Sequence, residues 1–173
     1  MKRLGLFSLI IAIMSAGSMA AHPAESSEET IVFVVRHAEK ASDDRDPVLS
    51  EAGTARASAL ARLLADAGIE KIFTTQYQRT RLTAAPLAQA GRIEADVVEA
   101  TATHAEDLAS RIRSSHRGGR LLIVGHSNTV PAILGALGVP DPPPLTDADY
   151  DRLYIVTLSQ DGRAGLITLR YGE

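Results

Sequence analysis

Residues 31–38 read IVFVVRHA, so that five consecutive apolar residues lead directly into Arg36 and His37. A continuous, largely β-branched run of this kind is typical of a strand that is buried on both faces of a parallel sheet. Residues 120–126, RLLIVGH, contain a second apolar run and end on His126. The two runs therefore predict a buried parallel sheet that carries Arg36, His37 and His126 at the carboxyl ends of its strands.

Helical and strand patterns alternate between and around these two runs. Ser50 is placed to cap a helix that continues to about residue 67, where Leu60, Leu63 and Leu64 share a face. A strand over residues 71–75 then leads into a helix that contains Arg79. This part of the chain predicts one strand–helix–strand–helix unit.

The C-terminal part continues the alternation. A short strand near 95–98 precedes a helix near 104–116, and a second helix is expected over 128–137. Asp161-Gly162 indicates a hairpin turn between two final strands. The whole order predicts an α/β fold, a three-layer α/β/α sandwich with a mainly parallel central sheet and an antiparallel C-terminal edge hairpin.

The N-terminal segment has the pattern of an export signal. Lys2 and Arg3 precede an apolar run, and small residues follow as far as Ala20. The apolar run is shorter than the roughly 20 residues that a spanning helix needs, which favours cleavage over the alternative of a retained membrane anchor. We expect residues 1–20 to be a signal peptide, 21–30 a disordered lead-in and 31–173 the folded domain, located in the periplasm or secreted without a membrane span.

Composition limits the classes of partner. The chain carries a formal net charge of −3 and contains no Cys, which excludes disulfides, thiol chemistry and a lipid-modified cysteine. An acidic chain is poorly suited to binding nucleic acid through its overall field. If the protein binds an anion, it must do so through a local cluster of positive groups.

Such a cluster is predicted at the carboxyl edge of the sheet, where ligands bind in open α/β folds. Arg36, His37, Arg79 and His126 all follow predicted strands at this edge. Arginine presents a rigid fork of donors that matches phosphate oxygens. A neutral imidazole can attack phosphorus in line and form a phosphohistidine, which divides one difficult displacement into two easier ones. The residues therefore predict a phosphate site with a histidine nucleophile.

These motifs resemble those of the histidine phosphatase superfamily, which has the phosphoglycerate mutase-like fold. The resemblance covers nearly all of residues 31–170 and implies that His37 is the phospho-acceptor, with Arg36, Arg79 and His126 forming the phosphate pocket. The segments that carry it are Arg36-His37-Ala38, residues 74–84 (TTQYQRTRLTA), Gly125-His126-Ser127, and Leu49-Ser50-Glu51-Ala52-Gly53 with Arg56-Ala57.

The general acid is not fixed by these motifs. The mutase branch of the family carries its catalytic Glu in a long insertion after the second strand, and this chain has no such insertion. We expect the acid to follow the third strand, with Glu99 and His104 ranked first and Glu106 and Asp107 as alternatives. Glu39 and Lys40, directly after the first signature, are candidates for substrate contact or for a surface ion pair.

The function expected from the sequence is a phosphomonoesterase, a histidine acid-type phosphatase acting on an extracytoplasmic phosphate ester through a phosphohistidine intermediate. Its substrate would be a phosphorylated small molecule or glycolipid. No metal or other cofactor is expected, because two arginines beside the histidines would repel a cation. The alternatives are a non-catalytic phosphate-binding or sensing module and a protein phosphohistidine phosphatase.

Overall fold

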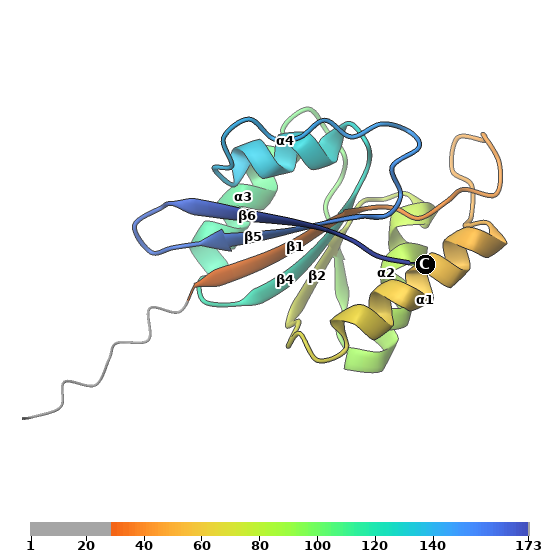
Figure 1. Cartoon of the computed structure of the whole chain (residues 1–173), viewed down its shortest axis with the longest axis horizontal. Helices are drawn as coiled ribbons and strands as arrows, with labels where there is room; N and C mark the ends of the chain where they lie inside the picture. Colours follow the sequence, from red (N-terminus) through yellow and green to blue (C-terminus); the bar gives the residue numbers. More distant parts are fainter. Residues whose placement is uncertain (1–28, 173) are drawn as a thin grey trace, which may run out of the picture.

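The computed structural model describes residues 29–172, which form one six-stranded sheet in the order β3-β2-β4-β1-β5-β6 (Figure 1). The first four strands run parallel, β5 is antiparallel to β1, and β6 is antiparallel to β5. The strands are β1 (Thr30–Arg36), β2 (Lys71–Thr74), β3 (Ala95–Val97), β4 (Arg120–Gly125), β5 (Arg152–Leu158) and β6 (Ala164–Arg170). The helices are α1 (Glu51–Leu64), α2 (Gln78–Gly91), α3 (His104–Ser115) and α4 (Thr129–Ala136).

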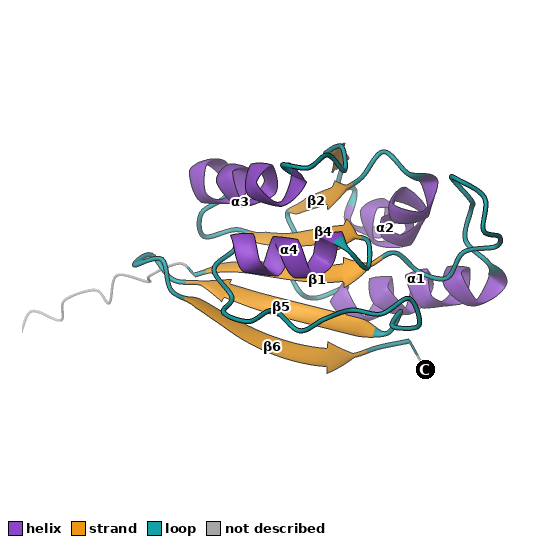
Figure 2. Ribbon diagram, turned by 90° about the horizontal axis from the view of Figure 1, so that it is seen from above, coloured by secondary structure: helices purple, strands orange, loops and turns teal. Residues whose placement is uncertain are grey.

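The sheet separates two helical layers, with α1 and α2 on one face and α3 and α4 on the other (Figure 2). Alternate residues of β1 face opposite layers: Val32 and Val34 pack against α3 and α4, whereas Phe33 and Val35 pack against α1 and α2. This explains why the β1 sequence is apolar throughout. The predicted three-layer α/β/α sandwich with an antiparallel C-terminal edge hairpin is confirmed.

The start of α1 is set by the motif that precedes it. Ser50 caps the helix, since its hydroxyl accepts a hydrogen bond from the Gly53 N–H at 3.1 Å. A Cβ on Gly53 would lie 2.2 Å from the carbonyl oxygen of Glu39, so only glycine allows the helix to approach the segment after β1 this closely. Of the three leucines expected to share a buried face, Leu63 is 51% exposed, because α1 covers the sheet with a narrower stripe than predicted.

The register of β1 on β4 brings the two histidine segments together. Arg36 pairs with Gly125, and the N–H of His37 donates to the Gly125 carbonyl at 2.9 Å, one step past the end of the strand. His37 and His126 therefore leave neighbouring strands at the same level. Because β2 is also parallel to β4, Thr75 emerges at the same edge of the sheet.

The predicted signal peptide, residues 1–20, and most of the predicted lead-in, residues 21–30, lie outside the described residues. The first strand begins at Thr30, which pairs with Leu158 of β5, one residue before the predicted start of the domain. Within residues 29–172, no helix is long and apolar enough to cross a membrane.

Candidate active site

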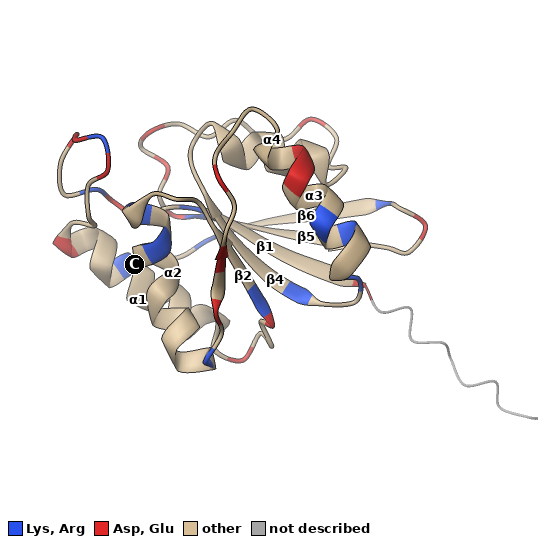
Figure 3. Ribbon diagram, turned by 180° about the vertical axis from the view of Figure 1, so that it is seen from behind, with Lys and Arg blue, Asp and Glu red and all other residues tan. Residues whose placement is uncertain are grey.

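A pocket of about 360 Å³ opens at the carboxyl ends of β1, β2 and β4. Its floor is formed by Arg36, His37 and His126, and the start of α4 adds its N-terminal turn on the same side. Two charged loops border it: the loop between β1 and α1, which carries both signs of charge in Figure 3, and the loop that precedes β5. The lining is completed by Lys40, Asp44, Arg45, Tyr77, Arg79, Ala100, Thr101, Ser127, Asn128, Thr129 and Asp147.

His37 has a defined tautomer. Its Nδ1 lies 2.8 Å from the carbonyl oxygen of Ala38, and since a carbonyl can only accept, Nδ1 must carry the proton. In the neutral ring, Nε2 then holds a lone pair. Burial lowers the pKa of His37 to about 4 and outweighs the hydrogen bond to Ala38, while the positive charges of Arg36, Arg79 and Lys40 lower it further. His37 therefore presents an unprotonated ring nitrogen at neutral pH.

Thr83 of α2 holds the segment that orients His37. Its hydroxyl oxygen accepts from the N–H of Ala38 at 2.9 Å and donates to the carbonyl of Arg79 at 2.7 Å. The side chain of Thr83 is fully buried. One hydroxyl thus ties the backbone beside the histidine to the backbone of the second arginine.

Arg36 is 4% exposed and is held by the loop before β5. Its Nη1 donates to the carbonyl of Thr146 at 2.9 Å, and its Nη2 lies 3.3 Å from Oδ1 of Asp147. The guanidinium also lies over the ring of Tyr150, 4.1 Å from its centroid. These contacts fix the plane of the guanidinium at the floor of the pocket.

Arg79, in the first turn of α2, is held by the loop between β1 and α1. Its Nη1 donates to the carbonyl of Arg45 at 3.4 Å and lies 3.9 Å from Oδ1 of Asp46, and its guanidinium stacks on Tyr77 at 4.3 Å. Asp46 also accepts from the N–H of Gln78 at 2.8 Å, which fixes the start of the helix. Each phosphate-site arginine is thus held by its own loop.

His126 packs edge-on against His37, with ring centroids 5.3 Å apart. Its Nε2 lies 3.0 Å from the hydroxyl of Thr75, and that hydroxyl is itself 3.0 Å from the hydroxyl of Thr80. Burial, followed by the charge of Arg79, lowers the pKa of His126 to about 3. When the Thr75 hydroxyl donates to Nε2, the neutral ring carries its proton on Nδ1 and can donate from that atom.

Three buried nitrogen atoms of the pocket residues have no hydrogen-bond partner among the described residues: Nε of Arg36, Nε of Arg79 and Nδ1 of His126. A buried donor without a partner is costly in a folded protein and is found most often where a ligand supplies the acceptor. Two positive side chains lie near two neutral histidines here. The arrangement fits an anion with several oxygen acceptors.

The residues predicted to supply the acid do not reach this pocket. The side chain of Glu99 is exposed and does not contribute to the lining, and its carbonyl accepts from Nδ1 of His104 at 3.0 Å. His104 is 3% exposed, and burial lowers its pKa, so it is neutral and sits behind the pocket rather than in it. Glu106 and Asp107 lie on the exposed face of the first turn of α3.

Glu39 and Lys40, the two residues predicted to contact substrate, point in different directions. Glu39 turns toward α1, where both of its carboxylate oxygens accept from Nε of Arg56, at 2.8 and 3.0 Å. Burial alone would raise the pKa of the Glu39 carboxyl, but the hydrogen bonds from Arg56 hold it below its usual value. Lys40 does line the pocket, and its Nζ lies 3.0 Å from Oδ1 of Asp43.

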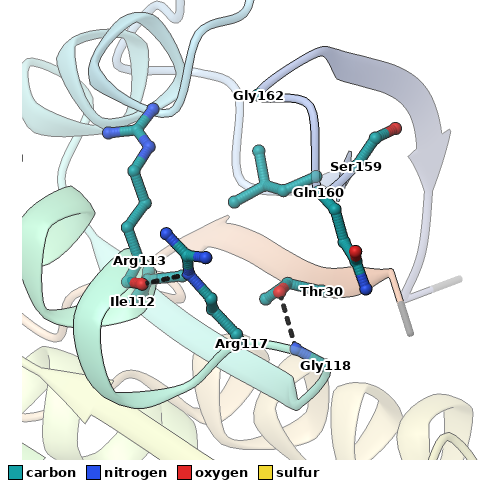
Figure 4. A pocket seen from close by; sticks show the side chains of 9 residues that line it. Thr30, Ile112, Arg113, Arg117, Gly118, Ser159, Gln160 and Gly162 are labelled. Carbon is teal, nitrogen blue, oxygen red and sulfur yellow. Dashed lines mark hydrogen bonds between the residues drawn. The ribbon is translucent and has the colours of Figure 1, made fainter. Parts of the chain in front are cut away.

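A second hollow, of about 300 Å³, lies near the start of β1, far along the sheet from His37 (Figure 4). Arg113 and Arg117 are its charged lining residues, and both bind helix carbonyls: Arg117 Nε donates to the carbonyl of Arg113 at 2.7 Å, and Arg113 Nη2 to that of Ala136 at 3.0 Å. Its lining holds neither a histidine nor a carboxylate. This hollow therefore lacks the histidines that line the first pocket.

Sequence reasoning missed the residues that support the site. Thr75 follows directly after β2, so the strand-end rule that found His37 and His126 would also have indicated it. Asp147 and Tyr150 lie more than 110 residues from Arg36 in a loop without periodicity, and no local signal links them to the pocket. Between residues 29 and 172, no group of three or more metal-ligating side chains comes together.

Comparison with known proteins agrees with this geometry. Residues 32–102 match the family model of the histidine phosphatase superfamily (branch 1). No curated protein matched the chain. A candidate phosphohistidine phosphatase, SixA, from Agrobacterium tumefaciens is 26% identical, with 81% of this chain and 97% of that chain covered and a TM-score of 0.59.

Two structures of lower sequence identity also share the fold. The protein histidine phosphatase SixA in complex with tungstate is 18% identical, covering 81% of this chain and 96% of its own, with a TM-score of 0.65. A mycobacterial glucosyl-3-phosphoglycerate phosphatase is 13% identical, covering 82% and 99%, with a TM-score of 0.66. The chain is therefore similar to the histidine phosphatase superfamily over residues 32–102, and it shares the fold of these solved phosphatases.

Proposed function

We propose that this protein is a phosphomonoesterase that acts outside the cytoplasm and carries the phosphoryl group on Nε2 of His37. The hydrogen bond from Nδ1 of His37 to the Ala38 carbonyl carries the proposal. A neutral ring whose only N–H is used elsewhere has no donor to offer a phosphate oxygen. It offers a lone pair, which serves a nucleophile and disfavours a simple anion binder.

The remaining pocket residues bind the phosphoryl oxygens in this mechanism. Arg36 and Arg79 supply guanidinium donors and His126 donates from Nδ1; in each of the three residues one nitrogen, Nε of either arginine or Nδ1 of His126, has no partner within residues 29–172. These donors stabilise the charge of the trigonal-bipyramidal transition state, where preorganised positive groups have their largest effect. Water then attacks the phosphohistidine and releases phosphate, which regenerates neutral His37.

The second candidate is a protein phosphohistidine phosphatase. It is favoured by the similarity to the Agrobacterium protein described as a candidate phosphohistidine phosphatase. A phosphohistidine-containing peptide and a simple alkyl phosphate separate the two functions, because a protein phosphohistidine phosphatase should hydrolyse the peptide with a kcat/KM at least ten times higher. Comparable or faster turnover of the alkyl phosphate supports the phosphomonoesterase.

The experiment that tests the covalent mechanism is partitioning between water and methanol. If every substrate passes through the same phosphohistidine, the ratio of methyl phosphate to inorganic phosphate is identical for aryl and alkyl substrates. Alkaline quenching of a ³²P-labelled substrate should also leave label on the wild-type chain and none on His37→Ala. A product ratio that changes with the leaving group would contradict the common intermediate. EDTA should leave the rate unchanged.

The extracytoplasmic location is a proposal supported by the sequence pattern of residues 1–20. Expression of the whole chain in a Gram-negative host, followed by fractionation and N-terminal sequencing, tests it. We expect a periplasmic or secreted protein that begins at Ala21. A full-length chain in the membrane fraction would support a retained anchor instead.

A further inference from the structure

The leaving alcohol needs a proton, and the pocket contains two carboxyl groups that could supply it. Within residues 29–172, Asp44 and Asp147 are the carboxylates that line the pocket. Glu99 and His104, which the sequence favoured for this role, do not line the pocket. The choice of acid therefore lies between one aspartate on each of the two bordering loops.

Asp147 is fixed beside the phosphate site. Its Oδ1 accepts a hydrogen bond from the hydroxyl of Ser127 at 2.9 Å and lies 3.3 Å from Nη2 of Arg36. Ser127 directly follows His126, so the carboxyl group is tied to both strands that carry the histidines. Its side chain is 90% exposed, and its second oxygen, Oδ2, has no hydrogen-bond partner within residues 29–172.

The loop that presents Asp147 is itself held in place. Oδ2 of Asp149 accepts from the N–H of Thr146 at 2.9 Å and from its hydroxyl at 2.5 Å, which closes a turn around Asp147. The Thr146 carbonyl and the Tyr150 ring both contact Arg36. By contrast, Asp44 accepts from Ser42 at 2.7 Å on its own exposed loop, and no contact joins it to a histidine or arginine of the site within the described part of the chain.

We propose that Asp147 is the general acid and base of the reaction, an assignment that rests on the proposed phosphomonoesterase function. As Nε2 of His37 forms its bond to phosphorus, the bond to the ester oxygen breaks, and the Asp147 carboxyl gives its proton to that oxygen. The alcohol leaves, and the Asp147 carboxylate then takes a proton from the water that attacks the phosphohistidine. The second step restores both the carboxyl group and neutral His37.

The contact with Arg36 fits this cycle. An incoming phosphate competes with the carboxylate for the guanidinium, which frees Asp147 and leaves it next to a negatively charged group. The same aspartate is therefore an ion-pair partner in the free protein and a proton donor with substrate bound.

The test compares leaving groups in Asp147→Asn and in the matched control Asp44→Asn. Protonation matters most for a poor leaving group, so Asp147→Asn should slow an alkyl phosphate about 100-fold or more and a nitrophenyl phosphate less than about 10-fold. Asp44→Asn should keep the wild-type ratio between the two substrates. The remaining nitrophenyl phosphatase activity reports that the variant is folded, and Asp147→Glu should restore part of the alkyl rate.

An unchanged substrate ratio in Asp147→Asn would overturn the assignment, and so would a changed ratio in Asp44→Asn alone. Both results leave the proposed function standing, because wild-type turnover and methanol partitioning do not depend on which aspartate acts. A wild-type protein that hydrolyses neither substrate would overturn the proposed function, and the acid role with it.

Discussion

The floor of the pocket and its mouth are built in different ways. The floor consists of Arg36, His37 and His126, all at strand ends and all less than 9% exposed, and the buried Thr75 lies behind His126. The mouth consists of two loops, residues 41–48 and 140–151, whose charged side chains are mainly exposed. Floor residues are fixed by the sheet register and by buried hydrogen bonds, whereas mouth residues are fixed by ion pairs at the surface.

The difference indicates a division of roles. A nucleophile and the residues that donate hydrogen bonds to the phosphate must be preorganised, because a displacement of about 1 Å at the reacting atoms can lower the rate about 100-fold. The parallel strands supply that precision. The loops lie outside the sheet and hold the outer edges of Arg36 and Arg79. Changes in the floor should therefore affect all substrates, and changes in the mouth should affect some more than others.

The largest effect is expected for His37→Ala. Loss of the nucleophile should reduce kcat by about five orders of magnitude for every substrate, as removal of a nucleophile does in other covalent hydrolases. Steady-state kinetics with an aryl and an alkyl phosphate measure this loss, and thermal unfolding shows whether the fold is kept. Retention of more than a trace of activity would assign the nucleophile to another residue.

The next effect concerns the second arginine. Arg79→Ala should lower kcat/KM about 100- to 1000-fold for both substrates, since a preorganised charged donor contributes on the order of 3–4 kcal/mol at the transition state. Arg81→Ala, an exposed residue on the same helix, is the matched control and should leave kcat/KM within about twofold. Equal losses in the two variants would mean that the charge of α2 matters, and not the position of Arg79.

The floor was predictable because its residues occupy positions with a simple rule. Arg36, His37 and His126 each follow a buried apolar run, and such runs are visible in the sequence. The mouth was not predictable, because the partner of Arg36 is Asp147, more than 110 residues away in an irregular loop. Glu99 and His104 follow β3 as expected, yet the turn into α3 directs the histidine inward and leaves Glu99 in solvent.

The buried histidines predict an acid-sensitive fold. The pKa of His37 is lowered to about 4, that of His126 to about 3, and both take up a proton near pH 6.5 in the unfolded chain. Below pH 6.5 the unfolded state binds more protons than the folded state, so the free energy of unfolding falls as the pH falls toward 4. Urea unfolding measured between pH 7 and pH 5 should show this decline.

The matched variant for the pH series is His37→Asn, which removes one of the two groups. Its free energy of unfolding should fall less steeply between pH 6.5 and pH 5 than that of the wild type. Parallel slopes for the two proteins would show that His37 titrates near its ordinary pKa in the folded state. That result would also remove the basis for a neutral nucleophile.

A smaller effect is expected from the buried hydroxyl behind His126. Thr75→Val keeps the shape of the side chain but leaves Nε2 of His126 without its partner at 3.0 Å. An unsatisfied buried group costs about 1–3 kcal/mol, so kcat/KM should fall about 10- to 100-fold for all substrates. Thr74→Val is the control, because the buried Thr74 hydroxyl has no partner in the described part of the chain and its removal should leave kcat/KM unchanged. Similar losses of kcat/KM in both variants would indicate that packing at the end of β2 matters, and not the hydrogen bond to His126.

The smallest effect on activity is expected for Glu39, which sequence position alone places beside the nucleophile. The structure turns it toward Arg56, whose Nη1 donates to the Tyr171 carbonyl at 2.8 Å, so that this pair joins the segment after β1 to α1 and to the C-terminal end of the described chain. Glu39→Gln removes the negative charge opposite Arg56 and replaces one acceptor oxygen by an NH2 group, which cannot accept from the guanidinium. It should lower the free energy of unfolding by about 1–2 kcal/mol and leave kcat/KM within about twofold.

Lys40→Gln, at the next residue, should have the opposite pattern: it should change substrate binding and leave stability nearly unchanged. Lys40 lines the pocket and, among residues 29–172, pairs only with the exposed Asp43, so the substitution should raise KM a few-fold for anionic substrates while stability stays within about 0.5 kcal/mol of the wild type. Chemical denaturation and steady-state kinetics on the two variants measure both quantities. If Glu39→Gln raises KM and leaves the free energy of unfolding unchanged, Glu39 contributes to substrate binding and belongs to the mouth of the pocket. Because these neighbours point their side chains in different directions, they test the boundary between the two regions at the resolution of a single residue.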